Sequence, residues 1–305
     1  MNELSAAAPS TVHSSSDEGP SQGEAIDVLR PAEQTLPVVF ASPHSGTHYP
    51  ESFVNASRLD AAMLRKSEDS FIDEIFAAAP RFGAPLIKAL FPRAYVDPNR
   101  EPFELDPTMF AEVLPPYVNV HSPRVSAGLG TIARVVANGA EIYRDKLTFA
   151  EAAERIDALY RPYHRALQGL LDETRRRFGW CFLVDCHSMP SVGGPMDADS
   201  GKTRVDFVLG DCFGASCAPR ITNHVDRALA RGDHTVTRNV PYSGGYTTVH
   251  YGRPRTGIHV LQIEINRALY MNEATYERLP GIAPLTAHVE GLMETLGELC
   301  AQMGA

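Results

Sequence analysis

The feature that most constrains the fold is an alternation between short apolar segments and longer segments with helical periodicity. Strand-like apolar runs occupy residues 36–44, 84–91, 131–137, 181–186, 205–211 and 259–266. Apolar residues recur at helical spacing over residues 61–80, 149–178, 218–231 and 285–303, with a bend expected at Pro162. Because crossover helices return the chain to the same end of a sheet, this order favours parallel strands. We therefore predict an α/β fold: a single domain with a mixed, mostly parallel sheet flanked by helices.

The N-terminal segment differs in composition from the rest of the chain. It is rich in Ser, Ala, Glu, Gly and Pro, and such a composition buries too little apolar surface to offset the entropy of ordering. The chain as a whole has 305 residues, of which 44% are hydrophobic, enough for a large core. We predict a flexible tail over residues 1–35 and one folded domain over residues 36–305.

Composition also excludes several classes of partner. The formal net charge is −9, and no cluster of Lys and Arg resembles a nucleic-acid footprint. No apolar run approaches the roughly 18 residues of a membrane span, and the N-terminus has no secretory signal. The five cysteines lack framework spacing, which favours reduced thiols. We expect a cytoplasmic protein without nucleic-acid or membrane partners; the sequence indicates no oligomeric state.

Reactive side chains stand where predicted strands end, which is where ligands gather in open α/β sheets. His44 follows the first strand at a Pro-His-Ser-Gly turn, and Asp185 and His187 share one face at the end of another. Glu264 lies between two isoleucines in a third strand. Because buried ionisable groups need a partner, these residues predict a site in which Glu264 serves as general base for a metal-bound water.

Simpler interpretations exist for each of these residues. A histidine that caps the turn by hydrogen bonds explains His44 equally well, and Asp185 is either an orienting carboxylate or a turn former. Glu264 could pair with an arginine at a sheet edge. Spacing alone thus predicts a metal hydrolase with no defined substrate.

The chain resembles the N-formylglutamate amidohydrolase family over residues 36–272. The shared motifs occur in the family's order: SPHSG, SEDSFIDEIF, FPRAYVDPNREPFELDP, GLGTIARV, RPYH, VDCHSMPS, NVPYSGGYTTVHYG and LQIEINRALYM. The family is related in fold to zinc exopeptidases of the carboxypeptidase type, so the resemblance implies that phosphorylase/hydrolase-like architecture.

The resemblance also implies a zinc site built on His44 and His187. In the related exopeptidases a carboxylate three residues after the first histidine is the third ligand, but here that position is Thr47. We choose Asp69 as the third ligand. The alternative carboxylates are Glu51, Glu68 and Asp73. Such a ligand set also accommodates Co²⁺, Mn²⁺ or Fe²⁺.

Further roles follow from the same resemblance. Asn99 and Arg100 resemble the exopeptidase Asn-Arg element that grips the α-carboxylate of a substrate, and Arg93 or Arg134 would take the side-chain carboxylate. Tyr246 and His250, which follow two glycines, would line the pocket or form a lid.

The function implied is zinc-dependent hydrolysis of the formamide bond of N-formyl-L-glutamate during histidine degradation, with Glu264 as the base. Two other hypotheses remain open at this point. One is a related amidohydrolase for another N-acyl or formimino amino acid. The other is a non-catalytic binding protein on the same fold.

Overall fold

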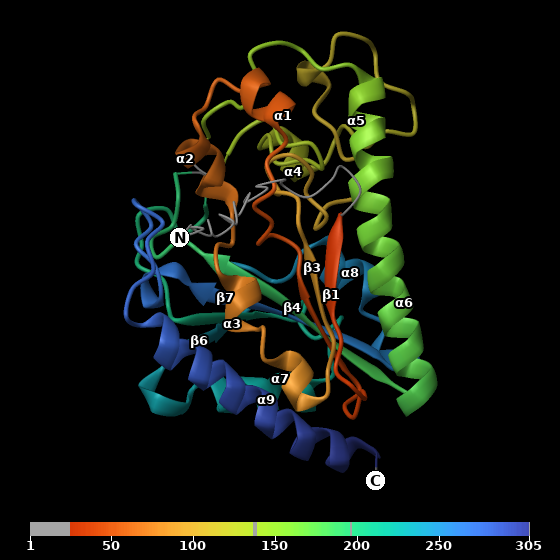
Figure 1. The fold of residues 1–305 in the computed structure, drawn as a ribbon, viewed down its shortest axis with the longest axis vertical. Helices are drawn as coiled ribbons and strands as arrows, with labels where there is room; N and C mark the ends of the chain where they lie inside the picture. The colour runs from red at the N-terminus through yellow and green to blue at the C-terminus, as the bar shows by residue number, and fades with distance from the viewer. Residues whose placement is uncertain (1–24, 137–138, 196, 305) are drawn as a thin grey trace, which may run out of the picture.

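The computed structural model describes residues 25–136, 139–195 and 197–304, which form one α/β domain around a seven-stranded sheet (Figure 1). The strand order is β1-β3-β2-β4-β7-β5-β6. The four strands β3, β2, β4 and β7 run parallel to one another, whereas β1 is antiparallel to β3, and β5 is antiparallel to β7. Strand β6 is parallel to β5. The prediction of a mixed, mostly parallel sheet is confirmed.

The strands are β1 (Ile26–Leu29), β2 (Val38–Ser42), β3 (Leu86–Ala89), β4 (Cys181–Met189), β5 (Phe207–Gly210), β6 (Val236–Arg238) and β7 (Ile258–Asn266). The α-helices are α1 (Glu51–Ala56), α2 (Ala61–Leu64), α3 (Ile72–Ile75), α4 (Pro123–Ser126), α5 (Phe149–Arg155), α6 (Arg161–Phe178), α7 (Pro219–Leu229), α8 (Tyr246–Tyr251) and α9 (Ile282–Gly304). A π-helical turn, Ile156–Tyr160, joins α5 to α6.

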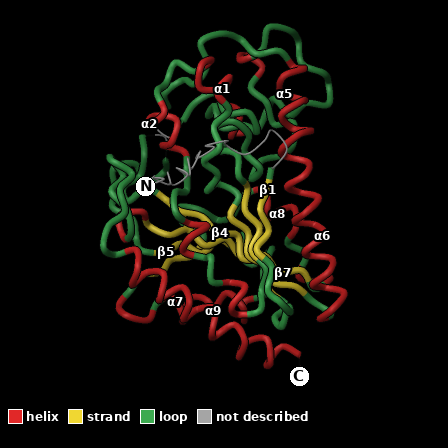
Figure 2. The backbone as a smooth tube through the Cα atoms, in the orientation of Figure 1, coloured by secondary structure: helices red, strands yellow, loops and turns green. Residues whose placement is uncertain are grey.

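Two apolar cores cover the two faces of the sheet, because neighbouring strand residues point to opposite sides. Leu183 of β4 lies in the core formed with α6, whereas Phe182 and Val184 lie in the core formed with α7 and α9. Figures 1 and 2 show α6 and α9 on opposite sides of the strands, with loop-rich chain beyond one end of the sheet. This two-sided burial explains why β4 and β7 are buried at every position.

Most of the predicted elements are confirmed, and three predictions are corrected. Residues 26–29, within the predicted tail, form edge strand β1, so the described fold begins before residue 36; residues 1–24 lie outside the described part. The segment 131–136 is not a strand and makes only an isolated bridge between Val135 and Glu141; the next residue of that prediction, 137, lies outside the described residues. The helix predicted over 61–80 is divided into short turns.

The division of this segment has a local cause. Phe71 takes a left-handed backbone conformation, with φ of 67°, immediately before α3. A non-glycine residue in that region cannot continue a right-handed helix. The interruption turns the preceding residues, including Asp69, towards the strand ends.

Among the described residues, no helix has both the length and the apolar character needed to cross a membrane.

Candidate active site

The sheet places the predicted chemical residues beside one another. In the parallel pairing of β4 with β7, Asp185 aligns with Gln262 and His187 aligns with Glu264. Gln262 and Glu264 share a face, and the Gln262 side chain donates a hydrogen bond of 2.8 Å to Glu264 Oε1. His44 follows β2, the strand on the other side of β4. Three neighbouring strand ends thus supply the site.

His44, Asp69 and His187 form a buried cluster whose potential ligand atoms lie within 4.8 Å of one another. Asp69 Oδ2 lies 3.3 Å from His44 Nδ1 and 3.0 Å from His187 Nδ1. Atoms that ligate zinc tetrahedrally at about 2.0–2.2 Å lie roughly 3.3 Å apart. The separations of Asp69 from the two histidine nitrogens therefore match those of a metal ligand set.

The opposite nitrogens of both imidazoles face other carboxylates. His44 Nε2 lies 2.8 Å from Asp97 Oδ1, and His187 Nε2 lies 3.0 Å from Asp185 Oδ2. Metal-ligating histidines almost always direct their second nitrogen to a carboxylate or carbonyl, which leaves the first nitrogen free for the metal. His44 Nδ1 is buried and has no hydrogen-bond partner within the described protein. The donor set and this unsatisfied nitrogen fit a divalent transition-metal ion.

The alternative carboxylates are engaged elsewhere. Glu68 accepts hydrogen bonds from Tyr49, Arg65 and Ser70. Asp73 pairs with Lys88, and Glu51 is exposed at the start of α1. The structure therefore brings Asp69, and none of these three, to the two histidines.

Asp69 is held in its ionised form by its surroundings. Burial alone would raise the pKa of this carboxyl, but its interactions with His187 and His44 hold the pKa well below its usual range. Its Oδ1 accepts hydrogen bonds from Ser188 Oγ at 3.2 Å and from Arg267 Nη2 at 3.0 Å. Both Asp69 oxygens are therefore fixed, one towards the histidines and one towards the sheet.

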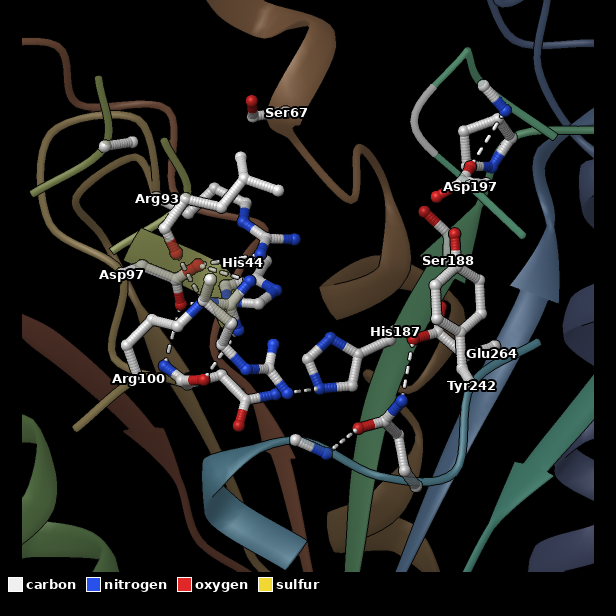
Figure 3. A pocket seen from close by; sticks show the side chains of 18 of the residues that line it. His44, Ser67, Arg93, Asp97, Arg100, His187, Ser188, Asp197, Tyr242 and Glu264 are labelled. Atoms are coloured by element: carbon white, nitrogen blue, oxygen red, sulfur yellow. Dashed lines mark hydrogen bonds and ion pairs between the residues drawn. The ribbon is translucent and has the colours of Figure 1, made fainter. Parts of the chain in front are cut away.

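The cluster lies beside a cleft with a cavity of about 340 Å³. Figure 3 shows His187 between a group that includes His44, Asp97 and Arg100 and a second group that includes Tyr242 and Glu264. Burial raises the pKa of Glu264 to about 7, in the range that suits a general base at neutral pH.

The predicted Asn-Arg element also borders the cleft, but its groups are partly committed within the protein. Asn99 Oδ1 accepts a hydrogen bond from the Thr247 backbone N–H at 2.8 Å, and its Nδ2 lies 3.2 Å from His187 Nε2. Arg100 donates to the carbonyls of Leu129 and Asn99. A side chain at Gly245 would place its Cβ 2.4 Å from the Asn99 amide, so this close approach requires glycine. Asn99 thus braces His187.

Arg93 reaches the cleft, whereas three other predicted substrate residues do not border it. Arg93 Nη2 donates to Asp97 Oδ2 at 2.7 Å and lines the cavity. The Arg134 guanidinium points away and pairs with Asp106 at 2.8 Å and with Glu141 at 3.3 Å. Tyr246 and His250, both on α8, stack on each other and do not line the cavity.

Sequence reasoning assigned no role to several residues that the structure places at the site. Asp97 has a recognisable signal, since a carboxylate between Arg93 and Arg100 in one extended stretch suggests a shared charge network. Arg267, which fixes Asp69, directly follows the strand that carries Glu264. Arg124 has no such signal because it lies in loop-rich chain without periodicity, yet it lines the cleft.

Comparison with known proteins agrees with this geometry. Residues 36–271 match the family model for N-formylglutamate amidohydrolase. The chain is 28% identical to N-formylglutamate deformylase from Pseudomonas putida, over 78% of this chain and 83% of that protein. It is also 28% identical to the Pseudomonas aeruginosa deformylase, over 88% and 96% of the two chains. The crystal structure of N-formylglutamate amidohydrolase from Ralstonia eutropha JMP134 superposes with a TM-score of 0.84 at 36% identity, covering 91% of this chain and 99% of that one.

Proposed function

The chain belongs to the N-formylglutamate amidohydrolase family and is an amidohydrolase, and on this premise we propose that it hydrolyses N-formyl-L-glutamate to formate and L-glutamate. The observation that carries the proposal is the buried His44–Asp69–His187 cluster beside a cleft lined by Glu264. We further propose zinc as the metal, with His44, Asp69 and His187 as its ligands. The pathway proposed on the family resemblance is histidine degradation in the cytoplasm.

A bound zinc ion would supply Lewis acidity, which acidifies water and polarises a carbonyl group. The protein's own residues orient its ligands. Asp97 fixes the His44 ring from behind, and the Asp185 carboxylate lies 3.0 Å from the His187 ring. Arg267 with Ser188 fixes Asp69. Residues of this supporting kind typically change metal affinity or activity by about 10–100-fold when they are mutated.

Glu264 is the proposed general base. It accepts a proton from the water that attacks the formyl carbon, and it returns that proton to the departing amine nitrogen as the C–N bond breaks. Its hydrogen bond from Gln262 holds the carboxylate on the cleft side of β7. Arg100 borders the same cavity and provides positive charge for the α-carboxylate of the substrate.

A related substrate is the second candidate. An N-acyl or formimino amino acid would use the same ligands and the same base, and would differ only in how the cleft receives its substituents. Such an enzyme is distinguished from the proposed one by turnover, whereas a non-catalytic protein on this fold would turn over none of these compounds.

The decisive experiment is a turnover panel on purified protein of known metal content. It compares N-formyl-L-glutamate, N-formyl-L-aspartate, N-acetyl-L-glutamate and formimino-L-glutamate, each with and without a chelator. We expect the highest kcat/KM for N-formyl-L-glutamate and its loss after chelation, with recovery on adding Zn²⁺. Preference for another compound would replace the proposed substrate, and turnover unaffected by a chelator that removes all bound metal would refute the metal site.

A further inference from the structure

The arginines that border the cleft differ in how their charge is compensated. Arg93 pairs with Asp97 at 2.7 Å, and Arg267 pairs with Asp69 at 3.0 Å. Arg100 shares Asp97 at 3.7 Å and donates two hydrogen bonds to carbonyl groups. For Arg124, in contrast, the described residues supply no hydrogen bond or ion pair to the guanidinium. Among the described residues that line the cleft, Arg124 is therefore the arginine whose charge the protein leaves uncompensated.

Arg124 is held in place by its backbone. Ser122 caps α4 by accepting a hydrogen bond from the Val125 N–H, and the Val125 side chain is buried. The Arg124 carbonyl accepts a hydrogen bond of 2.8 Å from the Leu129 N–H. The Leu129 carbonyl in turn accepts a hydrogen bond of 2.7 Å from Arg100 Nε. The two arginines thus belong to one connected wall of the cleft, with α4 beyond the end of β3 (Figure 1).

The arrangement is electrostatically incomplete without an anion. Burial lowers the pKa of Arg100 to about 10, and repulsion from Arg124 and Arg93 contributes to this shift while Asp97 opposes it. Like charges around one cavity disfavour each other until a negative group enters. The Asp97 carboxylate already pairs with Arg93, Arg100 and His44. A negative group on the ligand would therefore complete this wall of the cleft.

We propose that Arg124 binds the side-chain carboxylate of the substrate and makes the enzyme selective for N-formyl amino acids with an acidic side chain. The inference rests on the proposed function and deepens it. It assigns to Arg124 the role that the sequence suggested for Arg93 or Arg134. Arg134 is excluded by its pairing with Asp106 and Glu141 outside the cleft. Arg93 has its charge balanced by Asp97.

The test compares two substrates of the same shape, N-formyl-L-glutamate and its neutral amide, N-formyl-L-glutamine. The measured quantity is the ratio of their kcat/KM values in the wild type and in Arg124→Gln. A charge-assisted hydrogen bond contributes enough binding energy for roughly a tenfold to hundredfold effect. We expect the glutamate-to-glutamine ratio to fall by that factor in Arg124→Gln, mainly through a higher KM for the glutamate compound. Arg124→Lys should retain part of the preference because it keeps the charge.

Two control variants locate the effect. Arg134→Gln removes a nearby arginine outside the cleft and should leave the ratio unchanged. Lys66 also lines the cleft, and Lys66→Gln should change the ratio less than Arg124→Gln. A wild-type enzyme that hydrolyses neither compound overturns the proposed function and this inference with it. An active wild type whose selectivity survives in Arg124→Gln, or is lost in Lys66→Gln or Arg134→Gln instead, overturns the inference alone.

Discussion

Two histidine clusters contact opposite sides of the segment Asp97–Arg100 and differ in how their nitrogens are satisfied. On the cleft side, the His44 ring contacts the side chain of Asp97, and the His187 ring contacts the side chain of Asn99. In the packed cluster, His164 is part of an aromatic group with Tyr160, Tyr246 and Tyr251. His164 Nε2 donates to the Pro98 carbonyl at 2.9 Å, and its Nδ1 accepts from the Tyr251 hydroxyl at 2.7 Å.

The difference separates a binding role from a structural one. The protein satisfies both nitrogens of His164, so this ring has nothing left to offer a ligand. His44 is also buried, but its Nδ1 has no hydrogen-bond partner within the described protein. Since a buried polar atom without a hydrogen bond costs free energy, the cleft cluster is complete only when another group binds. Burial of a histidine therefore says little about its role, and the hydrogen bonds of the two ring nitrogens distinguish these two clusters.

The largest expected effect comes from removing the unsatisfied ring. Because Lewis-acid stabilisation by a metal is worth several kcal/mol, His44→Ala should lower kcat by roughly a thousandfold or more. It should also abolish stoichiometric zinc binding, as measured by metal analysis after dialysis. His250→Gln is the matched control, because His250 is an exposed histidine on α8 outside the cleft. Full zinc content in His44→Ala, or loss of zinc in His250→Gln, would contradict the assignment of the binding role to the cleft cluster.

The next effect tests the base beside the cleft cluster. Glu264→Gln keeps the shape of the side chain but cannot accept a proton, so kcat should fall by about 10²–10⁴-fold. Zinc content should be unchanged, because the three proposed ligands are intact. A variant with near-normal turnover would remove Glu264 from the mechanism.

The same residue sets the sign of the pH dependence. Burial raises the pKa of Glu264 to about 7 in the metal-free protein, and only the deprotonated carboxylate can act as base. Activity should therefore increase as pH rises through the pKa. A bound divalent cation favours the ionised form, so the kinetic pKa of the metal-loaded enzyme should lie below about 7. The kcat/KM profile of Glu264→Gln should lack this ascending limb.

The core of the site could be predicted because strands impose a simple geometry. The alternation of side chains along β4 and β7 puts Asp185 and His187 on one face and Gln262 and Glu264 on one face. Parallel pairing then brings the two sets into register. His44 required the family resemblance in addition, because a turn after a strand has no periodicity that fixes the direction of a side chain.

The cleft wall could not be predicted in the same way. Residues 90–136 and 139–148, between β3 and α5, are largely loops, and no local pattern relates Arg124 to Arg100. Arg134 was a reasonable candidate by charge, but Ala133 and Val135 line the cleft while the arginine between them points away. The edge strand β1 was missed because its four half-buried residues adjoin a polar segment. In each case the decisive information is a long-range contact.

The smallest expected effect concerns stability and tests the packed cluster directly. Burial lowers the pKa of His164 to about 4, whereas an unfolded histidine titrates near about 6.5. Between these values the unfolded state binds more protons, so the free energy of unfolding contributed by neutral His164 is lost as pH falls. His164→Gln lacks this titration. Relative to it, the wild type should lose up to about 3 kcal/mol between roughly pH 7 and pH 4, as measured by urea unfolding of metal-free protein. Parallel stability curves for the two proteins would mean that His164 titrates like an exposed histidine, and the distinction between the two clusters would not hold.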